Sequence, residues 1–388
     1  MQTFSLWLSI TLYPHWMLLS WTFKSLLQPV SLSRWLAQRG VMDLSAVVSH
    51  LNAFAPPALA ESWDNVGLLV EPTPPHMVQK LLLTNDLTED VLEEAVGMGA
   101  EMVLSYHPPI FKALKRLTCG NWKERLMVKA LEKRIAIYSP HTAYDALSKG
   151  VNDWLGRATG PCVSLPLRAS LSLSHPGGNA HVLEFSCGLS ESVLSRVKSL
   201  QGVCLRTFQV SEEGEKRTRV RLSCSQKALQ QTLSILTEDP CVYRSVELLT
   251  LQKPPLLDTG MGRLCTLTEP VSLATALERI KTHVGLNHLR LGIGRGKTLE
   301  SSVSTVAVCA GSGSSVLSGV PADLYLTGEM SHHDVLDAVA EGRSVVLCEH
   351  SNSERGYLKE LRVQLEERLK GKVQVVVSQT DRDPLQVV

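Results

Sequence analysis

From Asp43 onward, the spacing of hydrophobic residues predicts alternating helices and strands. Residues 43–54 begin with an aspartate suited to cap a helix and then place apolar residues at helical spacing. The predicted strands that follow span residues 80–86, 101–105 and 135–139, and the predicted helices between them span 88–99 and 122–134. This βαβ order predicts a parallel sheet covered by helices.

The middle of the chain has a different pattern. Between residues 160 and 255 it runs strand, helix, strand, strand, helix, strand, which is the order of a ferredoxin-like domain. Segments that contain Pro and Gly, 165–179 and 252–260, flank this region and are interpreted as linkers. The α/β alternation then resumes, with strands predicted at 303–310, 322–327, 344–349 and 373–379.

We therefore predict an α/β protein in which a split parallel-sheet domain is interrupted by an inserted ferredoxin-like (α+β) domain. The first half of the α/β domain is expected at residues 43–159, the insert at 160–255 and the second half at 256–388.

Residues 1–42 are expected to be a leader or another dispensable extension. They contain no Asp or Glu and only three basic residues, Lys24, Arg34 and Arg39. This composition suits a mitochondrial transit peptide, whereas Pro14 and His15 interrupt the apolar stretch and disfavour a membrane span or a secretory signal.

Composition describes an ordinary globular chain. Of its 388 residues, 44% are hydrophobic and 20% are charged, and the net charge of +1 gives no reason to expect a nucleic-acid or membrane surface. The nine cysteines are spread singly without a C-x-x-C pair. We interpret them as reduced thiols of an intracellular protein, mostly in the core.

Polar residues follow four of the predicted strands. His107 comes after strand 101–105, Asp145 after 135–139, Glu329 after 322–327 and His350 after 344–348. Ligands of open parallel sheets bind beyond the carboxyl ends of the strands, so we expect these side chains on one rim of one sheet.

A metal site is one interpretation of this rim. A histidine and a glutamate four residues apart, His350 and Glu354, face the same side of a helix start, and this pair suits Zn, Mn or Fe better than Ca or Mg. The alternative is structural: Glu354 favours a helix N-terminus, Asp145 caps a helix and His107 only ends a strand. Their coincidence at four strand ends favours the metal site.

Other motifs give weaker evidence for a functional site. The segment 309–315, CAGSGSS, can hold an anion on its backbone N–H groups or form a tight turn. In 331–334, SHHD, Ser331 and Asp334 can form a cap that leaves His332 and His333 in the first turn of a helix. SWDNVGLLV, 62–70, is interpreted as a structural turn, and no Gly-x-Ser-x-Gly elbow or nucleophilic cysteine context is present.

Six segments together resemble the Nif three-like protein family, over about residue 43 to the C-terminus. They are SWDNVGLLV, LSYHPPIF, SPHTAYDA, CAGSGSS, TGEMSHHD and CEHSNSERG.

The resemblance implies a homo-oligomer with a dinuclear metal site that faces an internal cavity. His107, Asp145 and Glu354 match the ligands of one ion, and His350 and Glu354 match those of the second, with Glu354 as the bridge. The bacterial motif has two adjacent histidines where this chain has Tyr106 and His107, so one ligand of the second ion is lost. One or two divalent transition metal ions are expected.

Two functions follow as hypotheses. In the first, the protein binds metal and acts in cytoplasm and nucleus as a transcriptional co-regulator of corepressor type, through a protein partner of the transcriptional machinery and without binding nucleic acid or membrane directly. Residues 1–42, acting as a transit peptide, would direct it to mitochondria.

In the second hypothesis, the protein is a divalent-metal-dependent hydrolase, of cyclohydrolase or phosphoesterase type, acting on a nucleotide or a phosphate-bearing small molecule. Glu329, His332 and His333 are then the candidates for proton transfer, and the amides of 309–315 for phosphate binding.

Overall fold

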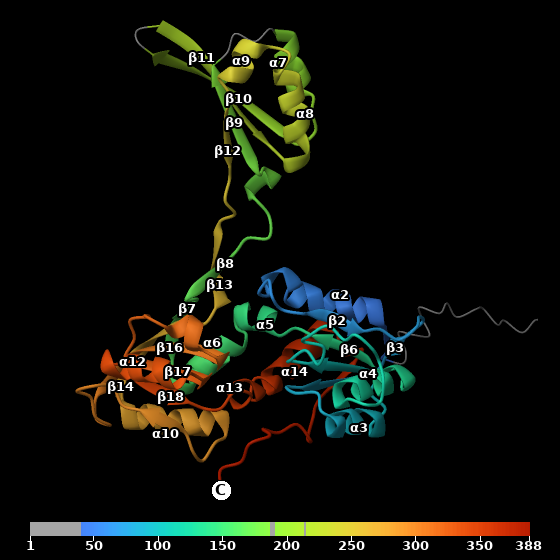
Figure 1. Ribbon diagram of the computed structural model, residues 1–388, viewed down its shortest axis with the longest axis vertical. Helices are drawn as coiled ribbons and strands as arrows, with labels where there is room; N and C mark the ends of the chain where they lie inside the picture. The colour runs from blue at the N-terminus through green and yellow to red at the C-terminus, as the bar shows by residue number, and fades with distance from the viewer. Residues whose placement is uncertain (1–39, 187–190, 213–214) are drawn as a thin grey trace, which may run out of the picture. The chain divides into compact units, whose positions relative to one another are not determined.

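The structure, a computed structural model, describes residues 40–186, 191–212 and 215–388 (Figure 1). The predicted leader, 1–42, lies outside these residues except for its last three. Within them, no helix is both long enough and apolar enough to cross a membrane.

A five-stranded sheet has the order β19-β4-β5-β6-β2. Neighbouring strands from β19 to β6 are parallel, and β2 is antiparallel to β6. The strands span Gly67–Val70 (β2), Lys80–Thr84 (β4), Met102–Ser105 (β5), Ala136–Ser139 (β6) and Gln374–Val377 (β19). A short antiparallel pair, Met42–Asp43 (β1) and Met77–Val78 (β3), forms separately.

Two helices of this half, α2 and α3, begin where the sequence predicts. Asp43 caps α2 (Leu44–Phe54), and the Thr88 side chain accepts from Val91 N–H to cap α3 (Glu89–Gly97). Each cap satisfies a backbone N–H that has no partner within the helix. The remaining helices are Trp122–Glu132 (α4), Thr142–Ala146 (α5) and Leu358–Arg368 (α14).

A second, six-stranded sheet has the order β15-β18-β17-β16-β14-β7, and only β16, β17 and β18 are mutually parallel. Its strands span Cys162–Leu165 (β7), Arg263–Ser272 (β14), Arg290–Gly292 (β15), Ser302–Ser312 (β16), Leu324–Glu329 (β17) and Ser344–Leu347 (β18). Its helices are Val151–Gly156 (α6), Leu273–Val284 (α10), Ser314–Leu317 (α11), His332–Ala340 (α12) and Asn352–Arg355 (α13).

The predicted α/β class is confirmed, but the expectation of one parallel sheet is wrong in two respects. There are two sheets, and each is mixed because antiparallel strands join its parallel centre. The longest of these, β14, was not predicted at all. After α14 the chain returns to the first sheet, where β19 pairs in parallel with β4.

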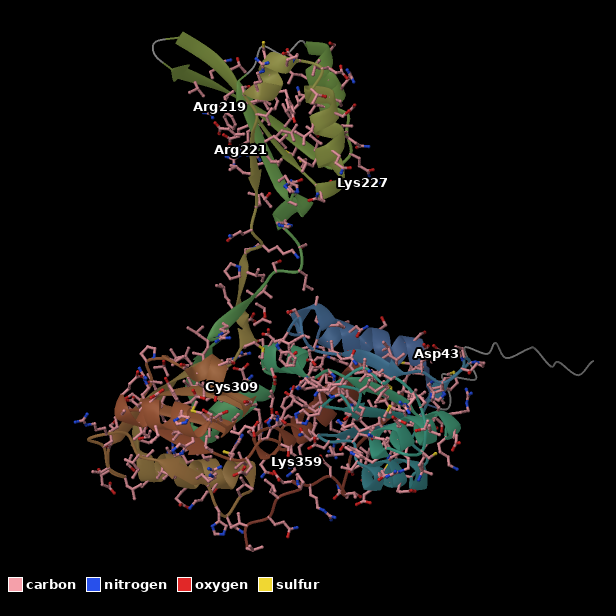
Figure 2. The ribbon with its side chains drawn as sticks, in the orientation of Figure 1. Asp43, Arg219, Arg221, Lys227, Cys309 and Lys359 are labelled. Carbon is pink, nitrogen blue, oxygen red and sulfur yellow. The ribbon has the colours of Figure 1, made fainter. Side chains whose placement is uncertain are left out.

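The middle of the chain forms a four-stranded antiparallel sheet in the ferredoxin-like order β10-β11-β9-β12. Its strands span His181–Ser186 (β9), Val203–Glu212 (β10), Glu215–Cys224 (β11) and Glu247–Thr250 (β12), and its helices Glu191–Lys198 (α7), Gln226–Leu236 (α8) and Pro240–Arg244 (α9). It has a buried apolar cluster of its own. Arg219 and Arg221, labelled on β11 in Figure 2, both form ion pairs with Glu184 of β9.

The two predicted linkers contain strands. Arg168–Leu171 (β8) pairs antiparallel with Pro255–Met261 (β13), so the segments that enter and leave the middle region form a ribbon. The interpretation of these segments as linkers rested on their Pro and Gly residues, but such residues are also compatible with an irregular edge of two strands. The exact domain boundaries stay a prediction.

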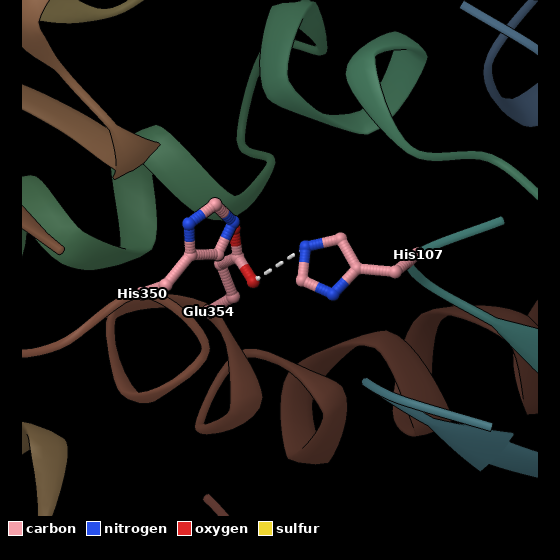
Figure 3. Close-up of side chains that lie close together, drawn as sticks. All are labelled: His107, His350 and Glu354. Atoms are coloured by element: carbon pink, nitrogen blue, oxygen red, sulfur yellow. Dashed lines mark ion pairs between the residues drawn. The ribbon is translucent and has the colours of Figure 1, made fainter. Parts of the chain in front are cut away.

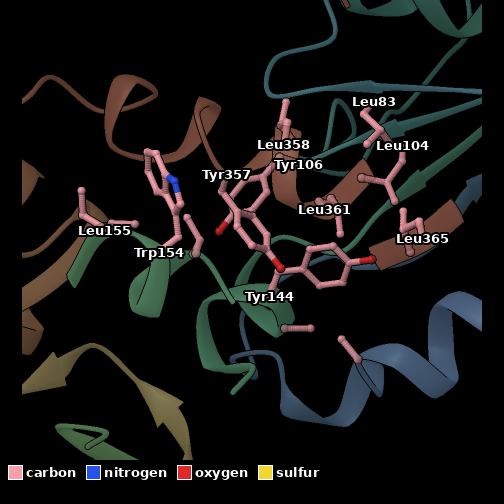
Figure 4. Packing of buried hydrophobic residues seen from close by; sticks show 14 of the residues in the cluster. Leu83, Leu104, Tyr106, Tyr144, Trp154, Leu155, Tyr357, Leu358, Leu361 and Leu365 are labelled. Carbon is pink, nitrogen blue, oxygen red and sulfur yellow. The ribbon is translucent and has the colours of Figure 1, made fainter. Parts of the chain in front are cut away.

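One buried cluster contains side chains from both large sheets. Leu83 and Leu104 of the five-stranded sheet belong to the same cluster as Val306 and Val346 of the six-stranded sheet. Tyr357, fully buried, lies in this cluster near α14 (Figure 4). Apolar packing therefore joins the two sheets, which brings residues distant in sequence into contact.

Candidate metal centre

His107 stands two residues after the end of β5, and a carboxylate just beyond the neighbouring strand β4 fixes its ring. The Nδ1 atom lies 2.8 Å from Asp86 Oδ1, and Asp86 stands just beyond β4. The backbone is held as well, since His107 N–H donates to Asn85 O at 3.0 Å. Because one ring nitrogen is engaged by Asp86, the other is left for a ligand.

His350 is placed in the same way at the other sheet. It follows β18, and its Nδ1 lies 2.9 Å from Oε1 of Glu329, the last residue of β17. Glu349, which precedes it, has a φ of 68°, a left-handed conformation that turns the chain at the strand end. Helix α13 then begins at Asn352 and contains Glu354.

Glu354 lies between the two histidines (Figure 3). Its Oε2 is 3.2 Å from His107 Nε2, and its Oε1 is 3.6 Å from His350 Nε2. Asn85 also donates to Oε2, at 3.0 Å. The predicted four-residue pairing of His350 and Glu354 is therefore present, and it is completed by a histidine from the other sheet.

These three side chains fit a metal ion. Each offers a ligand atom, and the three atoms lie within 4.8 Å of one another. His107 Nε2 is buried and has no hydrogen-bond partner despite its closeness to Glu354, as expected of a nitrogen oriented for a cation. A Cβ at Gly311 would lie 2.7 Å from Glu354 Oε1 and 3.1 Å from His350 Nε2, so a side chain at this position would crowd the group.

The electrostatics of the group also favour a cation. Burial alone would lower the pKa of His107, but the carboxylates of Glu354 and Asp86 outweigh burial and raise it. Burial would raise the pKa of Glu354, and the His107 and His350 imidazoles outweigh burial and lower it. In the absence of an ion, a proton thus supplies the positive charge that these carboxylates require.

Asp145 lies in the same cavity but outside the three-residue group. It is buried near the end of α5, and Tyr106 donates a hydrogen bond to its Oδ1. Burial and the negative charge of Glu354 raise the pKa of Asp145 to about 6. Tyr106 is thus a hydrogen-bond donor to Asp145.

The proton-transfer candidates are placed differently from one another. Glu329 lines the cavity and orients His350. His332 and His333 are exposed in the first turn of α12, where Ser331 accepts from Asp334 N–H as the sequence predicts, and neither is among the residues that line the cavity.

The loop 309–315 is less suited to phosphate than expected. Three of its amides already donate inside the protein: Ala310 to Asn152 Oδ1, Gly311 to Ser353 Oγ and Gly313 to Glu329 O. Amides with internal partners are not available to hold an anion.

A third carboxylate–histidine pair was missed by the sequence analysis. Asp64 Oδ1 lies 2.7 Å from His141 Nδ1, and Asp64 Oδ2 accepts from Thr142 N–H at 3.1 Å. His141 has a φ of 36°, a strained conformation held by these contacts. The segment 62–70 was interpreted as a turn because nothing local identifies a partner 77 residues away in the chain.

The C-terminal segment also supports the site. Asp381 Oδ2 accepts from Asn85 N–H at 2.8 Å and lies 3.2 Å from Arg355 Nε. Arg355 Nη2 in turn lies 3.6 Å from Asp86 Oδ2. A chain of charged contacts thus runs from Asp381 through Arg355 and Asp86 to His107.

The group lines a cavity of about 1130 Å³. The lining also contains aromatic residues, basic residues and part of the C-terminal segment: Trp63, Phe111, Trp122, Lys123, His141, Arg168, Thr380 and residues 382–385. A concave site with a mixed apolar and polar lining of this kind suits a small molecule.

Comparisons with known proteins agree with this architecture. The family described as Duf34/NIF3 (NGG1p interacting factor 3) matches residues 42–384. The chain is 57% identical to NIF3-like protein 1 of Rattus norvegicus and 55% identical to that of Homo sapiens, each over 355 residues that cover 91% of this chain and 94% of the relative.

The fold is similar to that of Staphylococcus aureus protein SA1388, with a TM-score of 0.69 and 21% identity over 89% of this chain and 99% of that chain. At this identity the likeness bears on the fold alone.

Proposed function

The chain belongs to the Duf34/NIF3 family, and on that premise we propose that it is a hydrolase of phosphate-bearing small molecules that depends on a divalent transition metal ion. The ion, Zn, Mn or Fe, is held by His107, His350 and Glu354. The observation that carries the proposal is the convergence of these three ligands on a cavity large enough for a small molecule.

Two carboxylates support this assignment. Histidines that bind metal characteristically donate their second ring N–H to a carboxylate, which fixes the tautomer and orients the ring. Asp86 is the carboxylate that contacts His107 in this way, and Glu329 is the one that contacts His350. We therefore assign Glu329 to orienting His350 and no longer propose that it transfers a proton.

The donor set suits one ion better than two. Three protein ligands leave a coordination position for water or substrate. Such an ion, when bound, supplies the Lewis acidity that activates water near neutral pH. Because Tyr106 donates to Asp145 Oδ1, that carboxylate is partly engaged, and a second ion would lack the neutral nitrogen ligand that Tyr106 replaces.

In the proposed reaction, the water oxygen bonds to phosphorus as the ester P–O bond breaks. One proton of the water stays on the released phosphate, and the other replaces the proton that the leaving alcohol oxygen takes from the protein. His141 lies in the cavity with its ring centroid 5.4 Å from that of His107. Asp64 engages Nδ1 and leaves Nε2 to donate to the leaving group. The cavity cations Lys123, Arg168 and Arg382 are available to the phosphate.

The test is metal content per chain, by elemental mass spectrometry on protein purified without chelator. We expect about one equivalent in wild type and in the control Glu367→Ala, an exposed glutamate of α14, and none in Glu354→Ala. Phosphate-ester hydrolysis should follow the metal and disappear after chelation. Absence of metal from the wild type would refute the proposal.

A co-regulator function is the second candidate, because the matched family is described by an interaction with NGG1p. An apolar edge would suit a protein partner: Leu248 and Leu249 on β12 are about half exposed at the edge of the four-stranded sheet. We propose that this edge binds the partner, in cytoplasm or nucleus, and that the chain forms a homo-oligomer.

The measurement for the second candidate is binding of purified NGG1p to the wild type and to Leu249→Lys. Loss of binding with metal content intact would support it, and binding by both proteins alike would exclude this edge. Light scattering of the same samples tests the oligomer.

A further inference from the structure

Aromatic side chains form a wall in the cavity beside the metal group. The rings of Trp63 and Phe111 have centroids 6.0 Å apart, and the His141 ring lies 6.0 Å from Trp63 and 6.3 Å from Phe111. Trp63 is 61% exposed and Phe111 46% exposed. Large aromatic residues left open inside a cavity, rather than packed in the core, indicate a surface for a ligand.

The wall is held rigidly by polar contacts behind it. Asp64, next to Trp63, has a fully buried side chain that engages His141. Asn65 Nδ2 donates to Ile110 O at 2.6 Å, which ties the segment carrying Trp63 to the segment carrying Phe111. A wall that is already formed costs little conformational entropy when a ligand binds.

Positive charge lies in the same cavity. Lys123, Arg168 and Arg382 are among its lining residues, which also include eight Asp and Glu residues. The Lys123 ammonium lies 5.4 Å from the centroid of the Trp122 ring, which also lines the cavity. The cavity thus combines flat apolar surface, cations and a cation-binding group, and a ligand that uses all three needs a ring and an anionic group.

We propose that Trp63 and Phe111, beside His141, form a subsite that binds a planar heteroaromatic ring, so that the substrate is a ring-bearing phosphate ester of the nucleotide type. This inference rests on the proposed hydrolase function and narrows its substrate class. Stacking on an aromatic residue raises the affinity for a base by roughly tenfold or more, with little dependence on which base it is. The ring subsite therefore sets the preference for ring-bearing over ringless phosphates.

The test compares the four ribonucleoside 5′-monophosphates with ribose 5-phosphate, which lacks the ring. Binding to the full chain is measured by calorimetry, with Mn²⁺ present and after chelation. We expect at least one nucleotide to bind roughly tenfold more tightly than ribose 5-phosphate. The ratio of the affinity for the nucleotide to the affinity for ribose 5-phosphate should fall towards one in Trp63→Ala and in Phe111→Ala. In Trp63→Phe it should return towards the wild-type value.

The matched control is Tyr243→Ala, an exposed aromatic residue of α9 that is not among the residues lining the cavity. It should keep the full ratio. Metal content of each variant, which should equal that of the wild type, shows that the fold and the metal group are intact.

The inference is overturned if no nucleotide binds better than ribose 5-phosphate, or if the preference survives in Trp63→Ala. Failure of the hydrolase proposal gives a different result, because the ring preference would then persist in both conditions while no ester is hydrolysed. Hydrolysis of ribose 5-phosphate and the nucleotides at equal efficiency would refute the ring subsite alone.

Discussion

Two regions of the site use the same chemistry at different depths. At the five-stranded sheet, His107 pairs with Asp86 at 2.8 Å, with side chains 21% and 35% exposed. At the six-stranded sheet, His350 pairs with Glu329 at 2.9 Å, with side chains 39% and 51% exposed. The same carboxylate–imidazole unit is thus built twice, and Glu354 is shared between the two copies.

The difference in burial indicates in which of the two pairs the charges interact more strongly. Charges near the surface are screened by water and salt, whereas partly buried ones interact more strongly. Asp86 illustrates this: burial would raise its pKa, but the His107 and Arg355 cations lower it overall. We therefore expect His107 and Asp86 to contribute more to metal affinity than His350 and Glu329.

Replacing each histidine in turn should give the largest difference between the two pairs. His107→Ala leaves the buried Glu354 carboxylate without its nearest cation and should cost about 3 kcal/mol of stability in the metal-free protein. His350→Ala should cost about 1 kcal/mol or less, because its surroundings are more exposed. Urea unfolding in chelator measures both, and equal losses would contradict the comparison.

The supporting carboxylates give the next largest effect. Asp86→Asn should weaken metal binding by roughly 10- to 100-fold, the usual cost of removing the partner of a metal-binding histidine. Glu329→Gln should weaken it by only a few-fold, because this side chain is half exposed. Competition with a chromogenic chelator measures both constants, and a larger loss in Glu329→Gln would reverse our ranking.

Asp145 provides a prediction with a defined pH window. Burial and the Glu354 charge raise its pKa from 3.8 to about 6, so its neutral form is favoured by folding and its ionised form costs stability near pH 7. Asp145→Asn should therefore stabilise the metal-free protein by about 2 kcal/mol at pH 7, with the gain vanishing as the pH falls towards 4.

Thermal unfolding in chelator across this pH range tests the Asp145 prediction. An Asp145→Asn gain that is the same at pH 4 and pH 7 would show that ionisation is not the cause.

The C-terminal anchor should have the smallest effect. Asp381→Asn weakens the contact with Arg355, which in turn contacts Asp86, so metal affinity should fall by about two- to fivefold. Asp383→Asn is the matched control, because Asp383 contacts Ser351 and Leu385 N–H instead. An equal loss in both variants would exclude the specific chain of contacts through Arg355.

Local features of the fold were predictable because their causes are local. The caps at Asp43 and Thr88 need only residues within three positions. The placement of His107 and His350 after strands is likewise readable from apolar runs. Asp86 could have been found by the same rule, since it stands just past the apolar run that forms β4.

Other features were unpredictable because their partners are distant. Asp64 is a turn residue until His141 lies beside it, and the linkers were misread because β8 and β13 form strands only by pairing with each other. Likewise, an exposed tryptophan such as Trp63 gains meaning only next to Phe111 and the metal group.

The sequence by itself determined those helices and strands that have a local apolar pattern, and the residue types at the ends of those strands, because backbone preference and hydrophobic period act over a few residues. Only the tertiary structure decided that these ends belong to two sheets and that His107 meets Glu354 across 247 positions of the chain. The physical reason is that one apolar cluster, built from both sheets, joins them and brings their polar edges together.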